Sequence, residues 1–191
     1  MIKIMRHAQA EHNMNEPESF NLKDPKLTDK GRRDTKNISE YIDQDSQFWV
    51  SPTVRTIETA MLLSHNNKIK VVDILGPRVY PHRKGKMNIC DQMSSNYNDK
   101  NVSTINLLSN KHPNDLGHQV FIKEFQTFIN DYIKDDESNV IITHDGVIAT
   151  LLEQYKNIKL ERDEHNDLML NNEIFQFTKS EIVDGWSYNI E

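Results

Sequence analysis

The apolar residues of this chain gather in short runs that alternate with stretches of helical spacing. The runs typical of buried strands cover residues 2–5, 47–50, 69–74, 140–143 and 174–178. Apolar side chains three or four positions apart predict helices over residues 29–43, 51–61, 120–133 and 146–155. Because strands alternate with helices, we expect a three-layer α/β fold with a mostly parallel central sheet and helices on both faces.

Local residues support two of the predicted helix starts. Thr28 can accept hydrogen bonds from the free N–H groups at the start of the helix over residues 29–43. Ser51-Pro52 is expected to open the next helix, since proline fits the first turn, where its missing N–H is no loss. Arg55 would then lie in the first turn of that helix, close to the end of a strand.

Length and composition favour one domain. The chain has 191 residues, of which 36% are hydrophobic and 27% charged, and this predicts a single domain over residues 1–191 with one core. Residues 96–118 are rich in asparagine. We expect this stretch to be a mobile surface segment within a polar insertion at about residues 76–118.

Charge and cysteine content limit the partners that we expect. The formal net charge of −6 gives no attraction of the whole molecule for nucleic acid or an anionic membrane, so neither is an expected partner. Cys90 is the only cysteine, which excludes an intrachain disulfide and a cysteine-rich zinc site. No signal sequence precedes the first strand and no apolar window approaches the roughly 20 residues of a membrane helix, so a cytoplasmic location is expected.

Two predicted strands end in a histidine. Arg6-His7 follows residues 2–5, and His144 follows residues 140–143. The carboxyl ends of parallel strands meet at one edge of a sheet, where ligands collect, so these side chains and Arg55 are expected to share a pocket. One guanidinium group can donate to two phosphate oxygens at once. The free N–H groups at the start of a helix can bind an anion as well. The sequence therefore predicts a site for a tetrahedral dianion.

The residues of this predicted site match a family pattern in four blocks that occur in the family's order. They are Arg6-His7 with Asn13, Leu27-Thr28-x-x-Gly31, Ser51-Pro52-x-x-Arg55-x-x-x-Thr59-Ala60 and His144-x-Gly146. Through these blocks the chain resembles the histidine phosphatase superfamily, which has the phosphoglycerate mutase-like fold. The resemblance implies a phosphatase that acts on a small phosphorylated metabolite, without a metal or other cofactor.

The resemblance also implies roles for the matched residues. His7 would be the nucleophile and would form a phosphohistidine, which water then hydrolyses. Arg6, Asn13, Arg55 and His144 would bind the phosphate oxygens, and His144 would also belong to the catalytic group. His7 must be neutral to attack, with its second ring nitrogen held by a hydrogen-bond acceptor.

The chain departs from the family pattern in three places. Ala8 stands where glycine is usual, and Ala10 where serine or threonine is common. The glutamate that often follows the third strand and donates the proton is missing from residues 73–78. Asp91 is the best substitute as proton donor, and Asp73 is a poorer one because it lies in or at the end of the predicted strand.

Other residues carry weaker signals. The basic segment 78–86 could bind a second anionic group, with Arg83 and Lys86 as first candidates, or could be an ordinary solvated loop. His7 and His12 lack the spacing of a helical zinc site, so no metal site is expected. The histidines that we expect to be ordinary surface or core residues are His12, His65, His112, His118 and His165.

The sequence leaves two alternatives to a phosphatase. One is a phosphotransferase of the phosphoglycerate mutase type, which the short chain disfavours. The other is a catalytically weak module that binds a phosphorylated ligand or another protein, which the missing glutamate favours. The identity of the substrate and the oligomeric state stay open at this point.

Overall fold

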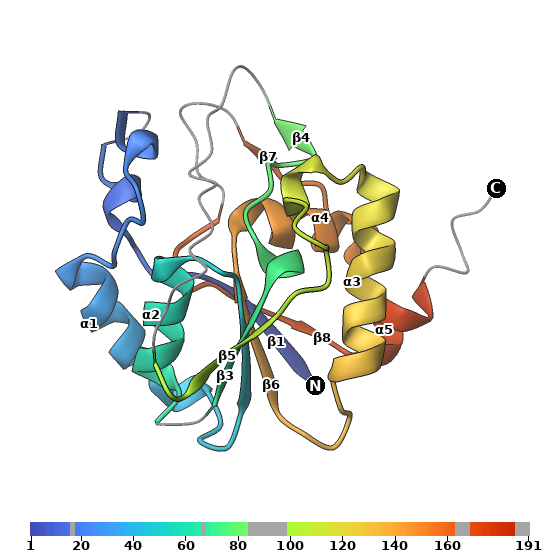
Figure 1. The fold of residues 1–191 in the computed structure, drawn as a ribbon, viewed down its shortest axis with the longest axis horizontal. Helices are drawn as coiled ribbons and strands as arrows, with labels where there is room; N and C mark the ends of the chain where they lie inside the picture. Colours follow the sequence, from blue (N-terminus) through green and yellow to red (C-terminus); the bar gives the residue numbers. More distant parts are fainter. Residues whose placement is uncertain (16–17, 66–67, 84–98, 163–168, 186–191) are drawn as a thin grey trace.

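The computed structural model describes residues 1–15, 18–65, 68–83, 99–162 and 169–185 (Figure 1). Its central sheet has six strands in the order β5-β3-β2-β6-β1-β8. These strands are β1 (Ile2–Arg6), β2 (Gln47–Val50), β3 (Ile69–Val72), β5 (Val102–Ile105), β6 (Asn139–Thr143) and β8 (Ile174–Phe177). All neighbouring strands pair in parallel except β8, which is antiparallel to β1. The predicted mostly parallel sheet is confirmed.

The helices lie on both faces of this sheet. They are α1 (Asp29–Asn37), α2 (Val54–Leu63), α3 (His118–Tyr132), α4 (Asp145–Lys156) and α5 (Lys179–Val183). Successive strand residues point to opposite faces, so Ile4 and Ile141 pack in the core that includes α3 and α4. Met5 and Ile142 pack in a second core with the apolar side of α2. The three-layer α/β architecture is therefore confirmed (Figure 1).

Short elements complete the chain. Single turns of 3-10 helix occur at η1 (Glu11–Asn13), η2 (Glu18–Asn21), η3 (Ser39–Tyr41), η4 (Asp73–Leu75) and η5 (Pro113–Asp115). A separate two-stranded sheet pairs β4 (His82–Arg83) with β7 (Glu161–Arg162). Among the described residues, no helix has the length and apolar content that crossing a membrane requires.

Several predicted helix and strand boundaries are wrong. The helix predicted over 29–43 ends at Asn37, because the Ile38 N–H bonds the Thr35 carbonyl three residues back and tightens the chain into η3. The helix predicted from Ser51-Pro52 begins at Val54, after an extended Thr53. The strand predicted over 69–74 ends at Val72, where η4 begins.

The prediction of a surface segment over residues 96–118 is also wrong for residues 102–105. They form β5, which pairs in parallel with β3 at one edge of the sheet. Ser103 and Thr104 are exposed in this edge strand, so the strand has no apolar run that sequence patterns would detect.

Thr28 does cap α1 as predicted, accepting the Gly31 N–H at 3.0 Å.

Candidate active site

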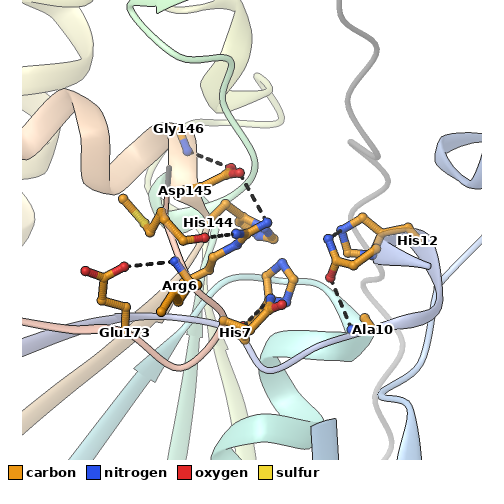
Figure 2. A network of polar contacts seen from close by, with 12 residues as sticks. Arg6, His7, Ala10, His12, His144, Asp145, Gly146 and Glu173 are labelled. Carbon is orange, nitrogen blue, oxygen red and sulfur yellow. Dashed lines mark hydrogen bonds and ion pairs between the residues drawn. The ribbon is translucent and has the colours of Figure 1, made fainter. Parts of the chain in front are cut away.

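The pairing of β1 with β6 brings two histidines together. Arg6 is opposite Thr143 in this parallel pair, so His7 and His144 both follow directly after a strand at the same edge of the sheet. Their ring centroids are 5.3 Å apart, and the side chains are only 2% and 3% exposed. Figure 2 shows both rings within one group of polar side chains. The predicted meeting of the two strand ends is thus present in the structure.

Hydrogen bonding defines the protonation of the His7 ring. Its Nδ1 lies 2.7 Å from the Ala8 carbonyl oxygen. A carbonyl oxygen only accepts, so the hydrogen of the neutral ring is on Nδ1 and Nε2 keeps its lone pair. The required acceptor is therefore a backbone group, which the sequence did not reveal. The His7 carbonyl in turn accepts a hydrogen bond from Asn171 Nδ2 at 3.1 Å.

His144 is held between two side chains from the region after β2. Arg55, in the first turn of α2 as predicted, places Nη2 3.3 Å from His144 Nδ1. Because the guanidinium only donates, Nδ1 accepts, and His144 Nε2 donates to Ser51 Oγ at 2.8 Å. Arg55 and His144 thus form one buried unit at the edge of the sheet.

Arg6 is buried and held on two sides. Its Nη2 lies 3.3 Å from Asp145 Oδ2 in an ion pair, and its Nη1 donates to the Met169 carbonyl. Asp145 Oδ1 also accepts the Gly146 N–H at 2.8 Å, in the first turn of α4 (Figure 2). The ion pair orients the guanidinium and reduces the cost of burying its charge.

Gly146 stands at a close approach of two chain segments. A Cβ atom at this position would lie 1.9 Å from the Arg78 carbonyl oxygen. Only glycine lets the chain after β3 pass this near to the start of α4. The glycine of the predicted His144-x-Gly146 block therefore has a packing function.

Burial and nearby positive charge act in the same direction on both histidines. Desolvation is the main cause that lowers the pKa of His7 and of His144 well below 6.5, and Arg55 is the next cause for each. Both rings are therefore neutral near pH 7. A neutral His7 with a free Nε2 is in the state that nucleophilic attack requires.

His12 is the residue of this cluster that sequence reasoning missed. It lies in η1, is only 6% exposed, and its ring centroid is 5.3 Å from that of His7. Asn13 is half-buried beside it, accepting the Ala10 N–H at 3.2 Å and placing Nδ2 3.4 Å from His12 Nε2. The available signal was the position of His12 five residues after His7, which sequence reasoning considered only for a metal pair.

The two carboxylates considered as proton donor have different outcomes. Asp73 is buried directly after β3, and its carboxylate accepts the N–H groups of Ile74, Leu107 and Leu108 at 2.8, 3.0 and 2.8 Å. These three bonds give Asp73 a structural role. Asp91 lies outside the described residues, as do Cys90 and Lys86.

The basic segment 78–86 is only partly described. Arg78 Nη1 donates to the carbonyls of Pro113 and Leu116, and its guanidinium lies 4.2 Å from the centre of the Phe121 ring. Burial lowers the pKa of Arg78 to about 10. Arg78 thus joins the loop after β3 to the start of α3, which gives it a structural role. The Arg83 side chain lies outside the described part of the structure.

The other histidines lie apart from the cluster or support loops. His65 and His118 are exposed as expected, and His165 is outside the described residues. His112 Nδ1 accepts the Asn114 N–H at 3.1 Å, although its charge also contributes to the lowered pKa of His144. Among the described residues, no group of three or more histidine, cysteine or acidic side chains is placed to hold a metal ion.

Comparison with known proteins places this arrangement in context. Residues 2–178 match the model of the histidine phosphatase superfamily (branch 1). No curated protein matches the sequence. Among solved structures, phosphoserine phosphatase of Entamoeba histolytica matches with a TM-score of 0.57 and 15% identity, covering 91% of this chain and 87% of its own.

Two further solved structures have the same fold. Ecdysone phosphate phosphatase of Bombix mori, in complex with tungstate, gives a TM-score of 0.56 at 14% identity, with 91% of this chain and 86% of that chain covered. Phosphoglycerate mutase of Thermus thermophilus gives 0.51 at 16% identity, with 90% and 88% covered. At these identities the similarity shows a shared fold.

Proposed function

The chain belongs to the histidine phosphatase superfamily, and from this premise we propose that it hydrolyses a small phosphorylated metabolite through a phosphohistidine on His7, without a metal ion. The observation that carries the proposal is the hydrogen bond from His7 Nδ1 to the Ala8 carbonyl. It leaves Nε2 free in a ring that burial keeps neutral. The phosphatases among the matched structures support hydrolysis over phosphoryl transfer.

The chemistry follows from these groups. His7 Nε2 attacks phosphorus in line, the bond from phosphorus to the ester oxygen breaks, and the leaving oxygen takes up a proton. Water then attacks the phosphohistidine, which releases inorganic phosphate and restores neutral His7. Arg6 and Arg55 stabilise the negative charge on the other phosphate oxygens during both steps. His144 joins them when the anion takes the Nε2–H now donated to Ser51 Oγ, and Asn13, beside His12, is a further donor.

Asp91 is proposed as the donor of the proton to the leaving oxygen. The support is that the alternative carboxylate, Asp73, already accepts three backbone N–H groups and so has a structural role. Asp91→Asn should slow esters with poor leaving groups far more than aryl phosphates, since only a poor leaving group needs the proton. Equal slowing of both classes would remove Asp91 from this role.

The function is tested by phosphate release from a broad panel of phosphorylated metabolites, with and without EDTA. We expect release that resists EDTA, is abolished in His7→Ala and is inhibited by tungstate, the anion bound by the matched ecdysone phosphate phosphatase. Release that EDTA abolishes would contradict a mechanism independent of metal.

The phosphoglycerate mutase among the matched structures makes phosphoryl transfer the second candidate activity. Exchange of labelled phosphate between substrates without net release would identify a mutase. Tungstate binding without either activity would identify a module that binds phosphorylated ligands.

A further inference from the structure

His12 is fixed against the candidate nucleophile by its own turn. The Ser19 hydroxyl of η2 donates to the His12 carbonyl at 2.6 Å, and the Asn13 N–H bonds the Ala10 carbonyl at 2.8 Å. These bonds hold η1 so that the His12 ring lies next to the His7 ring (Figure 2). The reaction proposed above does not use this buried imidazole.

We propose that His12 is a further phosphate ligand, which takes up a proton when a tetrahedral dianion binds at His7 Nε2. This inference rests on the proposed phosphatase function. Arg55 offers one positive charge to the anion, whereas the charge of Arg6 is partly balanced by Asp145. A protonated His12 supplies the second charge that a dianion requires, and it leaves His7 neutral for attack.

The contact with Asn13 is compatible with this change. Asn13 Oδ1 accepts the Ala10 N–H, so its Nδ2 is the atom that faces His12 Nε2. At 3.4 Å this is a long and weak hydrogen bond, so little is lost when it breaks. Protonation turns Nε2 from an acceptor into a donor, which exchanges the Asn13 contact for one to the anion. Asn13 Nδ2 then also donates to the anion.

Repulsion between the imidazoles opposes a charge on His12 until an anion binds. The His7 ring lies next to the His12 ring, and a charge on His12 is a cause of the lowered pKa of His7 and of His144. On its own turn and on η2 the acidic groups are directed elsewhere or exposed: Glu11 accepts the Lys26 N–H, and Glu18 is exposed. Among these described groups, a bound dianion is therefore the one that favours a charged His12.

Sulfate is the probe of choice, because its charge stays constant across the pH range in which histidine titrates. Calorimetry at about pH 6 and about pH 8 should show that the wild-type protein binds sulfate roughly tenfold more tightly at the lower pH. In His12→Gln, affinity at the lower pH should fall about tenfold and the pH dependence should disappear. His118→Gln, which changes an exposed histidine, should behave as the wild type.

The outcomes separate this inference from the proposed function. A His12→Gln protein that folds but keeps the wild-type pH dependence would overturn the role of His12, while phosphate release that depends on His7 would leave the function standing. Failure of the wild type both to bind sulfate and to release phosphate would remove the proposed function itself.

A measurement on the wild type covers the case in which the variant does not fold. Heats of sulfate binding near neutral pH, compared in buffers of different ionisation enthalpy, should show uptake approaching one proton. Binding without proton uptake would overturn the proposal.

Discussion

The strand ends at β1 and β6 differ sharply from the strand end at β3, although all three lie at the same edge of one sheet. Behind β3, Asp73 uses its carboxylate to accept three backbone N–H groups. Behind β1 and β6, His7 and His144 share a buried space with two arginines. The first arrangement satisfies its polar groups within the chain. The second places two neutral imidazoles beside two buried guanidinium groups, which is costly for folding and suited to an anion.

The partners of a buried polar side chain thus separate structural from functional residues. A buried side chain that is engaged fully by backbone groups stabilises the fold, and changing it should affect stability more than activity. A buried side chain whose protonation its neighbours oppose is positioned for the ligand, and changing it should affect activity more than stability. Five predictions test this separation.

The largest effect is expected from His7→Asn. Loss of the nucleophile should reduce kcat about 10⁴-fold or more. Stability should stay the same or rise, because the buried His7 ring lies among groups arranged for the ligand and not for the fold. Steady-state kinetics and thermal unfolding measure the two quantities, with His118→Asn at an exposed position as the control. Activity above a tenth of the wild type would place the nucleophile elsewhere.

The next effect is expected from Arg55→Lys, which keeps the charge and removes the planar pair of donors. The ammonium group cannot hold two phosphate oxygens and contact His144 at once, so kcat/KM should fall about 10²-fold. Arg33→Lys, at a position on α1 away from the cluster, provides the matched control. Equal kinetics of both variants would show that charge alone matters at Arg55.

Asp73→Asn should give the opposite pattern of effects. The new NH₂ group would face one of the three backbone N–H donors, so the free energy of unfolding should fall by about 2 kcal/mol. Activity at a temperature where the variant is folded should be retained. Chemical denaturation should show no such loss in Asp135→Asn, whose carboxylate is exposed. A variant that is stable but inactive would assign Asp73 to the chemistry instead.

Sequence patterns predicted the parts of this contrast that depend on neighbours in the chain. Arg6, His7 and His144 each follow directly from an apolar strand, and Arg55 lies in the first turn of a helix. The position of His12 was not predictable in this way, because it depends on how η1 packs against η2.

The role of Asp73 was hidden from sequence reasoning for a similar reason. Two of its three partners are Leu107 and Leu108, which come near only because β5 pairs with β3. β5 is itself a polar edge strand without an apolar run. Contacts between distant segments thus account for what the sequence left open.

Acid should destabilise the protein through the buried histidine cluster. The pKa of His7 and of His144 is lowered below 6.5, so below about pH 6.5 the unfolded chain takes up protons that the folded protein does not. Stability that is present above this pH is then lost as the pH falls towards the lowered values, by on the order of 1 kcal/mol per pH unit for each histidine. Denaturation between about pH 7.5 and about pH 5.5 should show a weaker slope in His7→Asn than in the wild type. Identical slopes in the two proteins would indicate that His7 does not resist protonation.

The smallest effect is expected from Asn171→Ala. Like Asp73, Asn171 bonds the backbone, but it does so at the nucleophile. Asn171 belongs to the turn before β8 and donates to the His7 carbonyl at 3.1 Å, while the Glu173 carbonyl in the same turn accepts the Arg6 backbone N–H. Loss of this one hydrogen bond loosens the backbone beneath the nucleophile without emptying the site, so kcat should fall about fivefold, which corresponds to about 1 kcal/mol. Leu170→Ala, at an exposed neighbour in the same turn, should leave kcat unchanged. A rise in KM with an unchanged kcat would instead place Asn171 in substrate binding, because a group that only positions His7 has no contact with the substrate.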